Sequence, residues 1–276
     1  MPLPSLPPDH HVHTLLCGHA TGTPEEYAEA AFLRGIPALA ITDHIPAPDG
    51  YDPETRMRME DFARYDAAVR KAQARWPGRI RFGIEADFYA GCESWLNTFL
   101  QTHPFDVVLG AVHFIGAWGF DNPAQIGGWQ ERPLDRIWSD YFDQVRRLAE
   151  TGLFDVIAHI DLPKKFGHRL PASRLLELAE PALQAIAARG LVLEINTGGL
   201  RKPVGEIYPS PALLRRACEL GIPILFGSDA HRPEDVGAGF TEAVRLAWAC
   251  GYSQHVIVEQ RRLRWESLPP APPATA

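Results

Sequence analysis

Residues 36–44 read IPALAITDH, an apolar run that ends in two potential metal ligands, Asp43 and His44. The same arrangement recurs along the chain, because short apolar segments repeatedly end in a histidine or an acid. Continuous apolar character is typical of strands that are covered on both faces. The segments that we predict as strands are residues 36–42, 80–85, 106–113, 154–159, 191–196 and 223–228, with a first strand near 6–13 and a last one at 255–259.

Amphipathic segments alternate with these strands. The first begins with a capping box, in which Thr23 is the N-cap, Pro24 is at N1 and Glu26 is at N3, and it ends before Gly35. Pro181 predicts a kink or a break in the fourth of these helices. The other predicted helices are residues 60–76, 134–151, 172–189 and 211–220.

Strands and helices that alternate about seven times predict parallel strands joined by right-handed crossovers. We therefore expect an α/β fold, a TIM-like (βα)7 barrel in a single domain that spans residues 1–268. An open doubly wound sheet is the alternative, but it would usually carry a glycine-rich phosphate turn after its first strand. Here the first strand ends in histidines, and the proline-rich residues 269–276 are expected to form a disordered tail.

The composition is that of an ordinary globular protein, with 276 residues, 46% hydrophobic and 22% charged. A formal net charge of -7 argues against a general affinity for nucleic acid. No apolar run approaches the roughly 18 residues that span a bilayer, and a signal-peptide pattern is absent, so a cytoplasmic protein is expected. The four cysteines are far apart and predict neither a zinc finger nor a disulfide framework.

Histidines and acids gather at one end of the predicted strands. His11 and His13 lie two residues apart, so both side chains point to the same face. The C-terminal ends of barrel strands meet at one face of the barrel, where active sites are built. Imidazole and carboxylate ligands suit zinc, iron or manganese, so we predict a divalent-metal centre. Its candidate ligands are His11, His13, His19, His44, Glu85, His113, His159, Asp229 and His231.

This ordered set resembles the motifs of the polymerase-and-histidinol-phosphatase (PHP) superfamily, and the resemblance covers almost the whole chain. More narrowly, five segments look like the histidinol-phosphate phosphatase branch of that superfamily. These are HTLLCGHA at 13–20, YDPETRMRM at 51–59, GIEADF at 83–88, DLPKKFGHRLP at 161–171 and GSDAHRPEDVG at 227–237.

The resemblance implies a distorted seven-stranded barrel that holds three divalent ions, with zinc, iron and manganese all possible. It assigns the first ion to His11, His13, Glu85 and Asp229. It assigns the second ion to Glu85 as a bridge together with His113 and His159, and the third to His19, His44 and His231. No ligand position is missing from this set.

The same resemblance implies hydrolysis of L-histidinol phosphate to L-histidinol and phosphate. A hydroxide that bridges two ions is the expected nucleophile, because coordination lowers the pKa of water towards about 7. The residues that we expect to act in catalysis are Glu85, His44 and Asp43. Asp43 has two open interpretations, as the proton donor to the leaving group or as a residue that only orients a ligand histidine.

Cations in the loops after the strands are candidates for binding the phosphate, with a solvated surface role as the alternative for each. The substrate-binding candidates are Arg56, Lys165, His168, Arg169 and Arg201, with Lys202 beside the last. Acids and aromatics near Asp87 are available to contact the histidinol portion, without a basis in the sequence for choosing among them.

Three alternatives remain open at this stage. The first keeps the site but acts on another small phosphate or a nucleotide, and the second is a metal-dependent amidohydrolase. The third is a non-catalytic binding protein stabilised by metal. We expect a small-molecule phosphomonoester as the partner, with neither nucleic acid nor membrane, and the sequence does not indicate an oligomeric state.

Overall fold

Seven strands form the central sheet of the computed structural model, which describes residues 6–270. They are β1 (Asp9–Val12), β2 (Leu39–Ile41), β3 (Ile80–Asp87), β4 (Val107–Ala111), β7 (Val156–Ile157), β8 (Val192–Asn196) and β9 (Ile224–Gly227). They lie in this order across the sheet, and each neighbouring pair is parallel. The predicted strands from the first to 223–228 are therefore all present in the sheet, in chain order.

The two edges of the sheet are joined by hydrogen bonds between β1 and the segment that follows β9. The backbone N–H of Asp229 donates to the carbonyl of His11 at 2.8 Å, and the N–H of His13 donates to the carbonyl of Ala230 at 2.9 Å. These bonds nearly close the sheet into a barrel. The predicted single-domain TIM-like barrel is confirmed, and an open doubly wound sheet is excluded.

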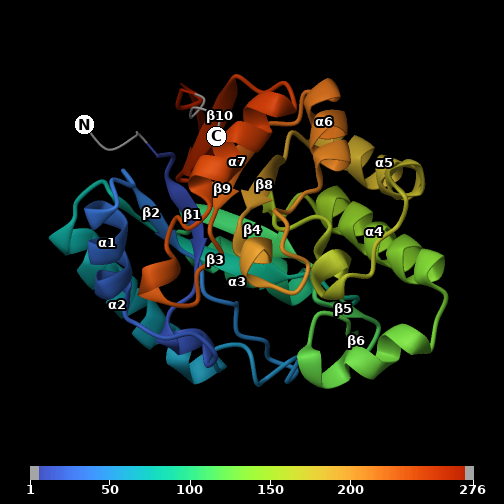
Figure 1. Ribbon diagram of the computed structural model, residues 1–276. Helices are drawn as coiled ribbons and strands as arrows, with labels where there is room; N and C mark the ends of the chain where they lie inside the picture. Colours follow the sequence, from blue (N-terminus) through green and yellow to red (C-terminus); the bar gives the residue numbers. More distant parts are fainter. Residues whose placement is uncertain (1–5, 271–276) are drawn as a thin grey trace.

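Helices surround the barrel, with α1 and α2 on one side and α4 and α5 on the other (Figure 1). The helices are α1 (Pro24–Leu33), α2 (Phe62–Arg75), α3 (Glu93–Thr102), α4 (Leu134–Thr151), α5 (Ala172–Arg189), α6 (Pro211–Glu219) and α7 (Phe240–Ala249). Short 3-10 helices lie at η1 (Leu15–Cys17), η2 (Met59–Asp61), η3 (Pro123–Gln130), η4 (Leu162–Phe166), η5 (Gly198–Arg201) and η6 (Pro233–Asp235).

The N-terminus of α1 has the predicted capping box, with Thr23 and Glu26 each accepting from the other's backbone N–H. Gly35, just beyond this helix, has a φ of 80° and so adopts the left-handed conformation that glycine favours. Pro181 lies inside α5, which continues through it over 18 residues. The predicted alternative of a helix split in two at Pro181 was therefore wrong.

Two helices, α3 and α7, were not predicted. Each has only ten residues, and neither begins with a side-chain cap or with the proline that starts α1 and α6. Their apolar spacing did carry information, because the buried residues of α7 include Phe240, Ala243, Val244 and Ala247, which is helical spacing.

The N-terminal end of the barrel is covered by an antiparallel hairpin of β10 (Gln254–Glu259) and β11 (Arg262–Ser267). Val256 and Val258 of β10 pack into the interior cluster formed by the barrel strands. At the hairpin turn, Arg261 donates to the carbonyl of Asp106 at 2.8 Å and pairs with Asp155 at 3.0 Å, and these two residues precede β4 and β7. The last predicted strand is thus present but lies outside the barrel sheet, and the opposite end of the barrel opens into a cavity.

A second short hairpin, β5 (Phe114–Ile115) and β6 (Trp118–Gly119), follows β4.

No helix among the described residues is long and apolar enough to cross a membrane. The predicted tail begins with Pro269, whose carbonyl accepts from Trp248 at 2.9 Å, and its residues 271–276 lie outside the described part. The boundary after residue 268 stays a prediction.

Candidate metal centre

Four predicted ligands meet at the open end of the barrel. His11 and His13 come from the end of β1, Glu85 from β3 and Asp229 from the segment after β9. The distances among Nε2 of His11, Nε2 of His13, Oε2 of Glu85 and Oδ1 of Asp229 include values from 3.0 to 3.9 Å. Ligand atoms bound about 2.0–2.1 Å from a tetrahedral zinc lie about 3.3 Å apart. The spacing of these four atoms therefore fits one divalent ion.

The surroundings of Glu85 provide an independent test of that fit. Oε2 of Glu85 lies 3.4 Å from His11, 3.3 Å from His13 and 3.0 Å from His44, all measured to ring nitrogens. This oxygen is buried, yet within residues 6–270 it has no hydrogen-bond partner. Leaving such an atom unsatisfied costs about 1–3 kcal/mol or more. A cation at the shared centre would satisfy the oxygen and the nitrogens together, so the residues fit a metal.

The charges of this group also suit a cation. Burial acts to raise the pKa values of Glu85 and Asp229, but the imidazoles around them, His44 and His11 foremost, hold both pKa values well below their usual range. Burial acts to lower the pKa of His11, but Glu194 and the two other acids outweigh it and raise that pKa well above its usual value. The acids are ionised, as metal ligands must be.

The second predicted set shares Glu85 with the first. Oε1 of Glu85 lies 3.0 Å from Nε2 of His159 and 3.8 Å from Nε2 of His113. Its other oxygen, Oε2, faces His11 and His13. One carboxylate therefore presents a separate oxygen to each set, which is the arrangement expected of a bridging ligand.

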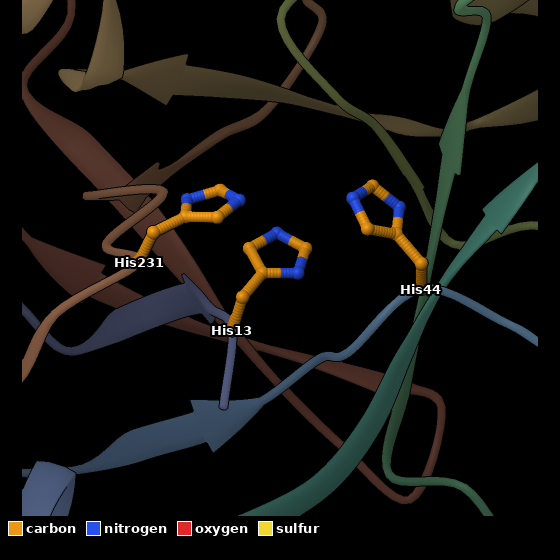
Figure 2. A group of neighbouring side chains, drawn as sticks. All are labelled: His13, His44 and His231. Carbon is orange, nitrogen blue, oxygen red and sulfur yellow. The ribbon is translucent and has the colours of Figure 1, made fainter. Parts of the chain in front are cut away.

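The third predicted set lies nearer the surface. Nε2 of His19 and Nε2 of His231 are 2.9 Å apart. His13, His44 and His231 form a potential ligand group, and Figure 2 shows their rings around a common space. His44 also belongs to a potential group with Glu85 and His113, so it lies between the second and third sets.

Asp43 and Cys17 form a further potential group with His13 on the buried side of the centre. The Asp43 carboxylate accepts from both the backbone N–H and the hydroxyl of Thr14, the latter at 2.6 Å. Burial raises the pKa of the Cys17 thiol, which disfavours the thiolate that a metal requires. Neither Asp43 nor Cys17 belongs to the described residues that line the open cavity.

A cavity of about 870 Å³ opens over the metal ligands. Cations on its wall are Lys165, Arg201, Lys202 and Arg232, and the acids on its wall include Glu54 and Asp121. Lys165 pairs with Asp121 at 3.0 Å, and Arg201 donates to the carbonyl of Ser228 at 2.6 Å. Two of the five predicted phosphate-binding residues, Lys165 and Arg201, therefore lie where a substrate can reach them.

The other three predicted substrate contacts, within residues 6–270, are placed away from the cavity wall. Arg169 pairs with Glu206 at 3.0 Å. His168 stacks on Trp129 with 4.0 Å between ring centroids. Arg56 is buried and pairs with Asp87 at 3.0 Å.

Comparison with known proteins explains this arrangement. The PHP domain family matches residues 9–198, which is well over half of the chain, and a PHP-associated family matches residues 214–245. The chain belongs to the PHP domain family. The first match contains seven of the nine predicted ligands, and the PHP-associated match contains the remaining two, Asp229 and His231.

Relatives of this PHP protein share most of its length. A protein named probable histidinol-phosphatase from Deinococcus radiodurans is 48% identical over 239 residues, covering 86% of this chain and 91% of the relative. The histidinol-phosphatase of Bacillus subtilis is 30% identical over 260 residues, covering 84% and 96%. The structure of a Lactococcus lactis histidinol phosphate phosphatase complexed with zinc, L-histidinol and phosphate has a TM-score of 0.80 at 19% identity, covering 94% and 99%. The structural match supports the fold.

The PHP centre contains one acid that sequence analysis missed. Glu194 of β8 is fully buried, and its Oε1 lies 2.7 Å from Nδ1 of His11. Its Oε2 accepts the backbone N–H of His159 at 2.9 Å. A charged residue in the middle of the apolar strand 191–196 was the available signal, because a buried acid needs partners.

Asp87 supports the other side of the PHP centre. Its Oδ1 lies 2.5 Å from Nδ1 of His113. Burial acts to raise the pKa of Asp87, but Arg56 and His113 hold it well below its usual range. Burial acts to lower the pKa of His113, and Asp87 reverses this effect and raises it to about 10. Asp87, considered for substrate recognition, is instead engaged with a ligand histidine.

Proposed function

We propose that this protein is a metal-dependent phosphomonoesterase that hydrolyses L-histidinol phosphate to L-histidinol and phosphate. One observation carries the proposal: the clustered ligands lie beneath a cavity that has cations on its wall. Lys165, Arg201 and Lys202 line the same cavity as the ligands. The substrate is suggested by the names of the relatives at 48% and 30% identity.

The ligand groups support a centre of three divalent ions, of zinc, iron or manganese. His11, His13, Glu85 and Asp229 would hold the first, and Glu85, His113 and His159 would hold the second. His19, His44 and His231 would hold the third. When bound, such ions supply an activated water at neutral pH and positive charge for the phosphoryl oxygens.

The side chains of the protein hold the substrate and the ligands in place. Lys165, Arg201 and Lys202 are placed to neutralise a phosphate dianion, and charge-assisted hydrogen bonds to it are strong. Asp43 supports the loop that carries His19, through its bonds to Thr14. Its contacts favour this orienting role over proton donation, because both of its oxygens are engaged away from the cavity.

The charge pattern of the cavity favours a substrate that carries a cation as well as a phosphate. Glu54 lines the wall, and no ion pair of its side chain is present within the described chain. Lys165 lines the same cavity. Histidinol phosphate has an ammonium and an imidazole at a distance from its phosphate, so it suits a cavity with both kinds of charge.

The test pairs elemental analysis of the purified protein with phosphate release from histidinol phosphate, several nucleotides and several sugar phosphates. We expect three ions per chain and a preference of at least about 100-fold in kcat/KM for histidinol phosphate. Equal rates on all phosphomonoesters would retain the chemistry and reject the substrate. One or two ions, with hydrolysis of amides and none of phosphates, would favour an amidohydrolase.

A further inference from the structure

One buried arginine fastens the loop after β2 to the rest of the protein. Arg56 donates through Nη1 to the carbonyl of Ile45 and through Nε to the carbonyl of Asp52, both at 3.0 Å. Its Nη2 contacts the carboxylates of Asp52 at 3.3 Å and Asp87 at 3.0 Å. All three guanidinium nitrogens are therefore engaged, and the side chain is 3% exposed.

Asp87 connects this arginine to a metal ligand. While Oδ2 of Asp87 contacts Arg56, its Oδ1 lies 2.5 Å from Nδ1 of His113. The opposite ring nitrogen of His113 faces Glu85 at 3.8 Å. Arg56, Asp87 and His113 thus form a continuous chain of contacts that ends at the ligand cluster.

The loop held by Arg56 also forms part of the cavity wall, since Asp52, Glu54 and Thr55 line the cavity. The Thr55 hydroxyl donates to the Asp52 carboxylate, which the arginine also contacts. The ring of Tyr51 lies 4.9 Å from the guanidinium. The guanidinium is therefore enclosed between the cavity wall and Asp87.

We propose that Arg56 is a positioning residue that fixes the 52–55 wall of the substrate cavity and, through Asp87, the orientation of the His113 imidazole. A planar guanidinium suits this role, because it presents five donors in a fixed fork, whereas a lysine is a point charge. Partners of ligating histidines normally set ring orientation and metal affinity. The proposal rests on the proposed function for the roles of the cavity and of His113.

The test compares Arg56→Met, which removes the charge, with Arg56→Lys, which keeps the charge and loses the fork. The matched control is Arg58→Met, since the Arg58 side chain is 69% exposed and pairs with Glu60. Three quantities are measured for each protein: metal content after gel filtration, the rate of cleavage after Glu54 by a glutamyl endopeptidase, and KM and kcat for histidinol phosphate. The first two need no substrate.

For Arg56→Met we expect loss of about one ion per chain and cleavage after Glu54 that is about tenfold faster. For Arg56→Lys we expect retained metal with a raised KM and little change in kcat. The lysine ammonium can still pair with Asp87, but it cannot make the several hydrogen bonds by which the guanidinium holds the 52–55 wall. Arg58→Met should match the wild type. Wild-type metal content and cleavage in Arg56→Met would overturn the proposal. If Arg56→Met does not fold, a wild-type KM in Arg56→Lys would overturn it.

Failure of the proposed substrate gives a different result. In that case the wild type would not hydrolyse histidinol phosphate, yet metal content and cleavage would still change in Arg56→Met. The two readouts therefore separate a wrong substrate from a wrong role for Arg56.

Discussion

Glu194 of β8 and His11 of β1 lie on barrel strands that are separated by β9, and their side chains meet in the interior with 2.7 Å between Oε1 and Nδ1. The other oxygen of Glu194 accepts the backbone N–H of His159. A single acid of β8 therefore contacts two residues that we assign to different ions. Bonding at Nδ1 of His11 fixes the tautomer that leaves Nε2 available to a metal.

Replacing Glu194 with Gln should weaken metal binding by about 10- to 100-fold, because the charged partner of His11 is lost while the side-chain shape is kept. Competition with a chromogenic chelator measures the affinity. Glu242→Gln is the control, since Glu242 is exposed on α7. Equal metal affinity in both variants would show that Glu194 has no such role.

Gly227→Ala, in β9 between β8 and β1, should disturb the contact between Glu194 and His11. A Cβ at this position would overlap the Glu194 carboxylate and lie 2.7 Å from the Cβ of His11. We expect a loss of about 1–3 kcal/mol in the free energy of unfolding, measured in urea, together with weaker metal binding. Gly127→Ala is the control, because a Cβ there has nothing within 4 Å. Similar stability of both variants would contradict the predicted overlap.

Glu85→Gln should abolish turnover and reduce the metal content, since it removes the carboxylate whose two oxygens face two ligand sets. An amide bridges two cations poorly, so we expect kcat to fall by at least about 1000-fold. Elemental analysis and phosphate release are measured on the same preparation. Retention of both metal and rate would remove the bridging assignment.

Glu54→Gln should affect a cationic substrate selectively. We expect kcat/KM for histidinol phosphate to fall about three- to tenfold, which corresponds to about 1 kcal/mol for a charge pair at the exposed Glu54. The value for p-nitrophenyl phosphate, whose leaving group has no cation, should stay within about twofold. Steady-state kinetics with both substrates provide the measurement, and an equal change for both would show that Glu54 does not contact the cationic portion.

His255 should make the protein less stable in mild acid. Burial lowers its pKa below the ordinary value of 6.5, against an opposing effect of Glu266, so the folded protein keeps this side chain neutral. Above pH 6.5 neither state binds the proton, and the stability is complete. As the pH falls below 6.5, the unfolded chain takes up a proton that the folded protein does not, and stability falls.

The variant His255→Gln removes this proton uptake. Between pH 7.5 and 5.5, its free energy of unfolding should decrease less than that of the wild type, by up to about 1 kcal/mol. Urea unfolding with excess chelator at both pH values measures the difference without metal binding. Identical pH dependence in the two proteins would show that His255 does not contribute.

Much of this protein could be predicted from local sequence. The boundaries of α4 and α5 are those expected from their apolar spacing and following glycines, because helix signals lie within one turn of the chain. The ten-residue helices α3 and α7 were missed, because they are shorter than the 18-residue α4 and α5 and begin with neither a capping side chain nor a proline. The strand at 255–259 was found, but its place outside the barrel depends on pairing with β11, which apolar spacing does not specify.

The metal ligands could likewise be predicted from the sequence, whereas the residues that support them could not. The sequence by itself determined the types of ligand and their places at strand ends, since parallel strands in one barrel bring those ends to one face. Only the tertiary structure decided which side chains support them. Glu194 reaches His11, 183 positions away in the chain, because β8 and β1 point their side chains into one interior. Arg56 was predicted at the substrate, but the folded loop buries it, and its guanidinium joins Ile45 and Asp52 of its own loop to Asp87, which lies 31 positions away in the chain.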